Sequence, residues 1–288
     1  MARFLYLISC FFLLMIDIHT HLYWESYDAD RDMVVKRARE TGVEKMICVG
    51  TSPKDIQQVI ALIERYEGVL GSVGFHPHTF DDGGGSKQDF DLLRKSVAHP
   101  KVVAIGECGL DYFVRETPIT EEMKIRQKKG FLAQIDLAKE CGLPLIIHTR
   151  PSAGTMDAYQ EMYDLLKATP ESLAVLHCYQ GDTEMTKKFL ALPDVYFSFT
   201  GNITYPVKKS VKGTSKDPAE VIRLIPLARI FTETDCPFLA PLSHRGERNE
   251  PSYVSFVWEK LGEIYGQDAV MIEEVLRKNF VTVFGEKV

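Results

Sequence analysis

The stretch Met15-Ile16-Asp17-Ile18-His19-Thr20-His21 is a short apolar run that ends in two histidines. Seven further runs rich in Val, Ile, Leu and Phe follow it along the chain. Each run is bounded by Gly, Pro or polar residues, as strands buried on both faces are. The eight predicted strands cover residues 13–18, 45–49, 69–75, 102–106, 143–147, 173–176, 195–199 and 229–232.

Segments with the helical spacing of apolar residues separate these runs. We expect helices over residues 29–41, 53–66, 88–98, 120–141, 155–167, 183–190, 217–225, 251–265 and 268–284. Alternating strands and helices indicate a parallel sheet, and eight such units in 288 residues match a (β/α)8 TIM barrel. A doubly wound open sheet is the alternative, because periodicity does not show closure. We expect residues 15–288 to form a single barrel domain, with the active site at the C-terminal ends of the strands.

The charge and the cysteines exclude several classes of protein. A net charge of -6 argues against a protein that coats nucleic acid, because that affinity comes from neutralising phosphates with Lys and Arg. A nucleic-acid enzyme stays possible if bound cations supply the positive charge. Six scattered cysteines without a CxxC pair indicate reduced thiols, so we expect a cytoplasmic protein without a disulfide framework.

An uncharged apolar stretch precedes the first predicted strand. Residues 4–16 are too few to span a bilayer, which needs about 20 residues. The residues after them offer no small-residue cleavage site for a signal peptide. We therefore expect residues 1–14 to be an apolar extension upstream of a natural start at Met15, and no stable association with a membrane.

Six candidate metal ligands fall at the ends of predicted strands. They are His19 and His21 after the first strand, Glu107 after the fourth, His148 after the fifth, His177 after the sixth and Asp235 after the eighth. In a parallel barrel these ends meet on one face, and side chains at i and i+2 of a strand point the same way. Four imidazoles and two carboxylates can hold two divalent cations with one carboxylate as a bridge.

The cysteines that follow three of these candidates favour oxygen and nitrogen ligands. Cys108, Cys178 and Cys236 each come directly after a candidate ligand, so in a strand they point to the opposite face. We expect all three to pack between barrel and helices. A site without thiolates is typical of hydrolytic zinc, manganese or magnesium chemistry.

Seven ordered blocks carry a resemblance to a known family. They are residues 17–21, 74–78, 106–112, 148–150, 177–179, 233–237 and 245–251. Together they resemble the signature blocks of the TatD family of metal-dependent deoxyribonucleases, within the amidohydrolase-like superfamily, over about residues 15–284. The resemblance implies a barrel with a binuclear metal site.

The resemblance also implies a role for individual residues. It assigns His19, His21 and Asp235 to one metal, His148 and His177 to the other, and Glu107 to the bridge. It places His76 near the scissile phosphate, and it makes Arg150, Tyr112, Arg245 and Asn249 contacts of the substrate.

Two segments depart from the family pattern. Tyr179-Gln180-Gly181 differs from the usual sequence after the sixth strand, which puts the nearby substrate wall in doubt. Residues 205–216 are longer and more basic than usual, with lysines at 208, 209, 212 and 216. This segment either guides a nucleic-acid backbone or is a solvated surface loop, and the second reading is favoured because charge runs usually are solvated.

The predicted activity is cleavage of DNA phosphodiester bonds, with exonucleolytic trimming favoured. Two cations bridged by Glu107 would lower the pKa of a bound water to about 7. Asp235 would accept the water's proton, and His76 would orient the ester or protonate the leaving oxygen. Arg150 suits a phosphate oxygen because its guanidinium is fork-shaped and always charged.

Two alternatives stay open at this point. The same site could hydrolyse a carboxylic ester or amide, as in an aminoacyl-tRNA deacylase, because the barrel fold does not select the bond. A non-enzymatic metal-binding barrel is disfavoured, because all the candidates converge on one face and structural sites are usually closed by four ligands. The expected partner is DNA or another phosphodiester, and no obligate protein partner is evident.

Overall fold

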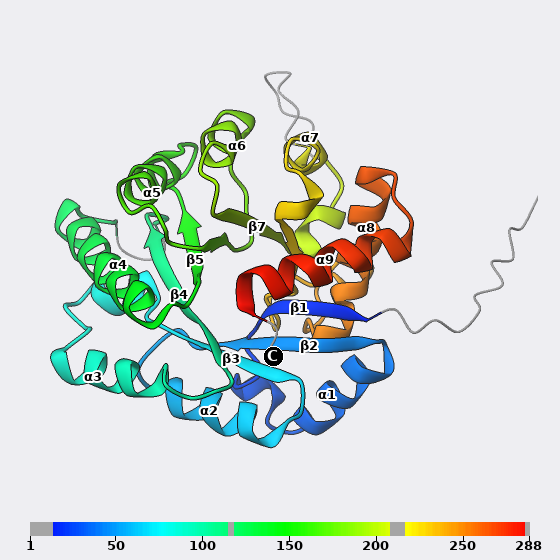
Figure 1. The fold of residues 1–288 in the computed structure, drawn as a ribbon, viewed down its shortest axis with the longest axis horizontal. Helices are drawn as coiled ribbons and strands as arrows, with labels where there is room; N and C mark the ends of the chain where they lie inside the picture. The colour runs from blue at the N-terminus through cyan, green and yellow to red at the C-terminus, as the bar shows by residue number, and fades with distance from the viewer. Residues whose placement is uncertain (1–13, 115–117, 208–216, 286–288) are drawn as a thin grey trace, which may run out of the picture.

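Eight parallel strands form one sheet in chain order (Figure 1). The computed structural model describes residues 14–114, 118–207 and 217–285. The strands are β1 Met15–Thr20, β2 Val43–Val49, β3 Val69–Val73, β4 Val102–Asp111, β5 Leu145–Arg150, β6 Ala174–Leu176, β7 Val195–Phe199 and β8 Ile230–Thr232.

The first and last strands meet, which closes the sheet. The Thr232 hydroxyl donates to the Ile16 carbonyl over 2.8 Å, and the Asp235 amide donates to the His19 carbonyl over 2.9 Å. Thr20 and Cys236 form a parallel bridge just beyond β8. The predicted barrel is therefore confirmed, and the open-sheet alternative is wrong.

Helices surround the strands (Figure 1). They are α1 Arg31–Glu40, α2 Ile56–Arg65, α3 Lys87–Ser96, α4 Glu121–Cys141, α5 Asp157–Ala168, α6 Thr183–Leu190, α7 Pro218–Ile222, α8 Val254–Tyr265 and α9 Ala269–Phe284. Side-chain caps begin several of them: Ser86 and Asp89 form a reciprocal capping box at α3, and Asp182 accepts the Met185 amide at α6. Among the described helices, none is long and apolar enough to cross a membrane.

The apolar side chains form two layers. One lies between the strands and the surrounding helices, and the other fills the barrel interior, where Ile16, Ile18 and Ile47 pack together. Phe280 and Phe284, near the end of α9, pack onto this interior layer. Figure 1 shows α9, the red helix, lying beside β1. Polar side chains are thereby left to the C-terminal ends of the strands.

Two strands are irregular where they carry candidate ligands. The pairing of β1 with β2 shifts register between Asp17 and Thr20, and that of β4 with β5 shifts between Ile105 and Cys108. Such irregularities re-aim side chains and are common next to active sites. Glu107 therefore lies inside β4, which corrects the prediction that it ends that strand.

Some predictions fall on residues that the structure does not describe. These are the apolar extension, except for residue 14, the start of the first predicted strand at residue 13, and the four lysines at 208, 209, 212 and 216. They stay predictions.

Candidate metal centre

The carboxylate of Glu107 lies at the centre of the polar cluster, and its two oxygens face different histidines. Oε1 is 2.9 Å from Nδ1 of His148 and 3.1 Å from Nε2 of His177. Oε2 is 3.5 Å from Nε2 of His19 and 3.8 Å from Nε2 of His21. The four imidazoles are thus divided into two pairs, one for each oxygen.

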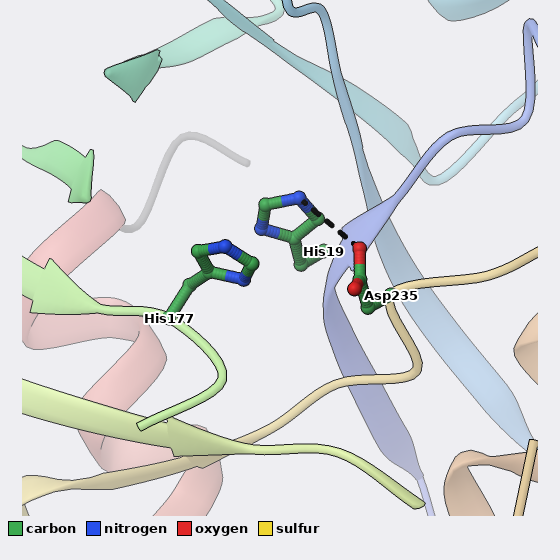
Figure 2. Close-up of side chains that lie close together, drawn as sticks. All are labelled: His19, His177 and Asp235. Atoms are coloured by element: carbon green, nitrogen blue, oxygen red, sulfur yellow. Dashed lines mark ion pairs between the residues drawn. The ribbon is translucent and has the colours of Figure 1, made fainter. Parts of the chain in front are cut away.

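Asp235 faces the second pair. Its Oδ1 is 3.3 Å from Nε2 of His21 and 3.8 Å from Nε2 of His19. Figure 2 shows this carboxylate pointing at the ring of His19 while His177 approaches from the other side. The rings of His19 and His177 are stacked with centroids 4.1 Å apart. All six predicted ligands therefore meet at one place.

The donor set fits divalent cations. The described residues hold three groups of imidazole nitrogens and carboxylate oxygens close enough to share an ion, and none of the groups includes a thiolate. The groups are His19, His177 and Asp235; His19, His21 and Glu107; and His76, Glu107 and His148. Imidazole and carboxylate ligands suit zinc and manganese, and carboxylates alone suit magnesium.

The backs of three rings face acceptors, as metal-binding histidines do, but only the His21 ring is hydrogen bonded there. Nδ1 of His21 is 2.8 Å from the Val49 carbonyl oxygen. Nδ1 of His177 is 3.6 Å from Glu233 Oε1, and Nδ1 of His19 is 4.0 Å from Glu233 Oε2, so Glu233 faces both atoms from beyond hydrogen-bond distance. Each of these contacts leaves the Nε2 atom of the ring for the centre of the site.

Glu233 is fully buried, and two donors hold its carboxylate in place. The Cys178 amide donates to Oε1 over 2.5 Å, and the Ser198 hydroxyl donates to Oε2 over 2.7 Å. Sequence reasoning gave Glu233 no role, although it opens the block at residues 233–237. Its position between two rings became visible only in the folded barrel.

Asp111 is a second residue that sequence reasoning missed. Its Oδ2 lies 3.2 Å from Nε2 of His148 and 3.2 Å from Nε2 of His78. Because Asp111 holds Nε2 of His148, the Nδ1 atom of that ring faces Glu107. Asp111 is in the block at residues 106–112, but β4 was expected to end before it.

His76 presents a different nitrogen arrangement. The His78 amide donates to its Nδ1 over 3.2 Å, and its Nε2 lies 3.8 Å from Glu107 Oε1. A neutral imidazole that accepts at Nδ1 carries its proton on Nε2. His76 therefore directs an N–H group into the site, and this tautomer makes it a hydrogen-bond donor there.

The electrostatics of the cluster depend on burial and on mutual contacts. Burial alone would raise the pKa of Glu107, but His177, His148 and His19 outweigh it and hold that pKa well below its ordinary value. Burial and the neighbouring His148 lower the pKa of His76 well below its ordinary value. Glu107 is therefore ionised and His76 neutral.

Of the four residues predicted to contact the substrate, two are arginines that lie beside aromatic rings and two are buried. Arg150 at the end of β5 places its guanidinium 4.0 Å from the centroid of the Phe113 ring, and exposed Arg245 lies 4.8 Å from that of Tyr205. Tyr112 and Asn249 are buried. The Tyr112 hydroxyl donates to Glu161.

Asn249 supports the loop that carries Asp235. Its amide donates to the Thr234 carbonyl over 2.9 Å and to the Phe238 carbonyl over 2.6 Å. Because the polar ends of Tyr112 and Asn249 are buried and used within the protein, their placement argues against the predicted substrate contacts. We assign a positioning role to Asn249, which supports the loop that carries Asp235.

The three cysteines beside the predicted ligands differ in how deeply they are buried. Cys108 and Cys236 are buried in the layer between strands and helices, as predicted. Cys178 is only partly buried, and its Sγ lies 3.7 Å from Oγ1 of Thr200. Its backbone φ of 45° turns it out of the strand direction, which is why the alternation rule was wrong for Cys178.

Comparison with known proteins decides the family. A family model described as TatD related DNase matches residues 16–285. The chain belongs to the TatD family. It is 36% identical over 273 residues to YabD of Bacillus subtilis, named an uncharacterized metal-dependent hydrolase, with 94% of this chain and 99% of that protein covered.

Two further TatD relatives span nearly the whole chain. It is 31% identical over 277 residues to a protein of Escherichia fergusonii named 3'-5' ssDNA/RNA exonuclease TatD, with 94% of this chain and 99% of that protein covered. The crystal structure of YJJV, a TatD homolog from Escherichia coli, superposes with a TM-score of 0.82 at 27% identity and covers 96% of this chain and 99% of that one. As a TatD protein, the chain is a metal-dependent hydrolase.

Proposed function

We propose that the protein hydrolyses phosphodiester bonds of DNA, trimming single strands from an end with two divalent cations. The observation that carries this proposal is the division of the site by Glu107. Its Oε1 faces His148 and His177, and its Oε2 faces His19 and His21. A carboxylate with a pair of imidazoles at each oxygen is suited to bridge two cations.

His19, His21 and Asp235 would hold one cation, His148 and His177 the other, and Glu107 both. Bound there, such cations would lower the pKa of water and offset negative charge on a phosphate. Zinc, manganese and magnesium are the candidates; the imidazoles favour zinc, and the carboxylates suit manganese or magnesium.

The chain's own residues supply the remaining steps. Asp235, ionised and beside His21, is placed to accept a proton from the attacking water. The Nε2–H group of neutral His76 is placed to donate a hydrogen bond to the ester or to the leaving oxygen. Arg150 can hold a phosphate oxygen with two parallel hydrogen bonds. Of these roles, that of Arg150 favours a substrate that carries a phosphate.

Support for a nucleic-acid substrate comes from the family. The relative from Escherichia fergusonii is named for single-stranded DNA and RNA, and cations would offset the chain's net charge of -6 at the phosphate. A free strand end also enters the mouth of a closed barrel more easily than the interior of a duplex does.

The test is incubation of metal-reconstituted protein with end-labelled single- and double-stranded DNA, RNA, bis(p-nitrophenyl) phosphate and an aminoacyl ester. We expect metal-dependent shortening of single-stranded DNA that a chelator stops. Rapid cleavage of the aminoacyl ester while every phosphodiester stays intact, with each metal tried, would overturn the proposal in favour of an ester hydrolase.

A further inference from the structure

Two exposed aromatic rings stand beside the metal centre. Trp24 follows β1 and Phe238 follows β8, and 37% and 45% of their respective surfaces are exposed. The two ring centroids are 5.3 Å apart and the ring planes meet at 78°. We call this pair the aromatic corner.

The aromatic corner adjoins a predicted metal ligand. The His21 ring lies 6.3 Å from the Trp24 ring and 6.2 Å from the Phe238 ring, centroid to centroid. The Nε2 atom of His21 faces Glu107 and Asp235. The corner is thus about one ring away from the place where a substrate phosphate would sit.

The exposed aromatic rings lie on one face of the barrel. Among the described residues, the exposed Phe and Trp side chains are Trp24, Phe113 and Phe238. They follow β1, β4 and β8, so all three lie on the face of the barrel that carries the metal centre. The Arg150 guanidinium lies over the Phe113 ring, whereas among the described residues no cation lies over the ring of Trp24 or Phe238.

The backbone holds the aromatic corner in place. The Trp24 amide donates to the His21 carbonyl over 2.9 Å, and Arg31 donates to the Trp24 carbonyl over 3.2 Å. The Phe238 amide donates to the Asp235 main-chain carbonyl over 2.9 Å, and the Phe238 carbonyl accepts from the Asn249 side chain over 2.6 Å. A rigid aromatic surface loses little conformational entropy when it binds a flat partner.

From this geometry we infer that the aromatic corner stacks one unpaired nucleobase of a single strand, that of the nucleotide whose phosphate lies on the His19, His21 and Asp235 side. The inference rests on the proposed function and deepens it. A base lying flat on one ring would meet the edge or face of the other, an arrangement that aromatic groups favour. A base inside a duplex has both faces covered and does not fit.

Stacking would also contribute affinity for a nucleic-acid strand that the charge of the protein does not supply. With a net charge of -6, the protein gains little long-range attraction for a polyanion. Stacking on an aromatic side chain contributes about 1–3 kcal/mol per base and tolerates any base, since every base has a π-face. The aromatic corner would therefore bind strands without reading their sequence.

The first experiment compares intact strands with strands that carry one abasic nucleotide at the first, second or third position from either end. In the native protein we expect kcat/KM to fall about 5- to 150-fold at one position, the equivalent of stacking one base. Trp24→Ala should bring the ratio of intact to abasic strand close to one, while Trp24→Phe should keep most of it. Met33→Ala removes an apolar side chain that is 49% exposed on α1 and should leave the native ratio.

The second experiment measures binding without turnover. The chain has two tryptophans, Trp24 and Trp258, and Trp258 is only 6% exposed. In the His76→Ala variant, which we expect to keep its metals and lose activity, oligothymidylate should quench the fluorescence of Trp24 more than the abasic strand does, and Trp24→Phe should remove the difference.

The outcomes separate the two proposals. A protein that cleaves strands but treats intact and abasic substrates alike refutes the aromatic corner and leaves the proposed function standing. A protein that cleaves no phosphodiester refutes the proposed function. If Trp24→Ala changes the oligomeric mass in light scattering and has no effect on base discrimination, the corner is a protein contact and the inference is wrong.

Discussion

The amide of His78 donates to Nδ1 of His76, and this bond turns the Nε2–H group of His76 toward Glu107. His76 is close enough to Glu107 and His148 to share an ion with them. The hydrogen bond favours a donor role for His76, however, because a nitrogen that carries a proton does not bind a cation.

His76→Ala should therefore retain bound metal and lose activity, about 100-fold or more for a lost hydrogen-bond donor. His148→Ala should lose metal and activity together, because Nδ1 of His148 is a proposed ligand. Elemental analysis of the two variants and of the native protein measures whether each variant has kept its metal. Metal loss in His76→Ala would make His76 a ligand.

Glu107→Gln tests the bridge between the two cations. Replacing one carboxylate oxygen by an amide group removes the charge that both proposed sites share, so we expect fewer metals per chain than in the native protein. Activity should fall more than about 100-fold, beyond the effect typical of outer-shell residues. Circular dichroism should show an unchanged fold. Full activity in this variant would refute the site assignment.

Glu233→Gln tests the residue behind His19 and His177. Loss of its charge should weaken metal binding about 10- to 100-fold, because outer-shell partners orient ligands and raise their basicity. Competition with a chromogenic chelator measures this affinity. Glu161→Gln is the matched control, since Glu161 accepts from Tyr112 and Lys128 away from the metals. Equal affinities in both variants would contradict an orienting role for Glu233.

Arg150→Ala tests phosphate positioning. A site that grips few phosphates has a shallow salt dependence, with a slope of about -0.7 per contact for single strands. We expect KM for single-stranded DNA to rise and the slope to lose about 0.7. Arg150→Lys should restore the slope but only part of the affinity, because Lys lacks the planar fork. Arg277→Ala on α9 is the control, and an identical change there would reduce Arg150 to general surface charge.

Asp157→Asn tests a stabilising contact in the loop that follows Arg150. Asp157 accepts from Ser152, Thr155 and the Ala158 amide. Burial opposes these donors, but they prevail and lower its pKa below the ordinary value. A lowered folded-state pKa stabilises the protein above the unfolded pKa of about 3.9, and that stability is lost as the pH falls through the folded value.

At pH 7 the Asn variant should lose about 1 kcal/mol of unfolding free energy, reduced by solvent screening. The difference from the native protein should close as the pH falls below about 4. Denaturant melts at pH 7 and pH 3.5 measure it. Asp164→Asn on the exposed face of α5 should change little at either pH, and a pH-independent loss in Asp157→Asn would point to packing in place of charge.

Much of this architecture could be predicted from the sequence by itself. Apolar periodicity is a local property, so it placed the strands within a few residues and the ligands near their ends. The spacing of His19 and His21 on one strand likewise predicted that both rings point into one site. The predicted end of β4 was too early, because a glycine among residues 108–111 interrupts the apolar run. Pairing with β5 extends the strand to Asp111.

Only the tertiary structure decided which role each side chain has in the site. Closure of β1 onto β8 brings Trp24 beside Phe238 and Glu233 behind His19, and no local pattern encodes contacts between the two ends of a chain. The separate environments of the two Glu107 oxygens and the proton position on His76 also depend on distances across the barrel. Burial removed Tyr112 and Asn249 from the predicted substrate contacts, because residue type indicates hydrogen-bonding capacity, whereas packing determines which partner uses it.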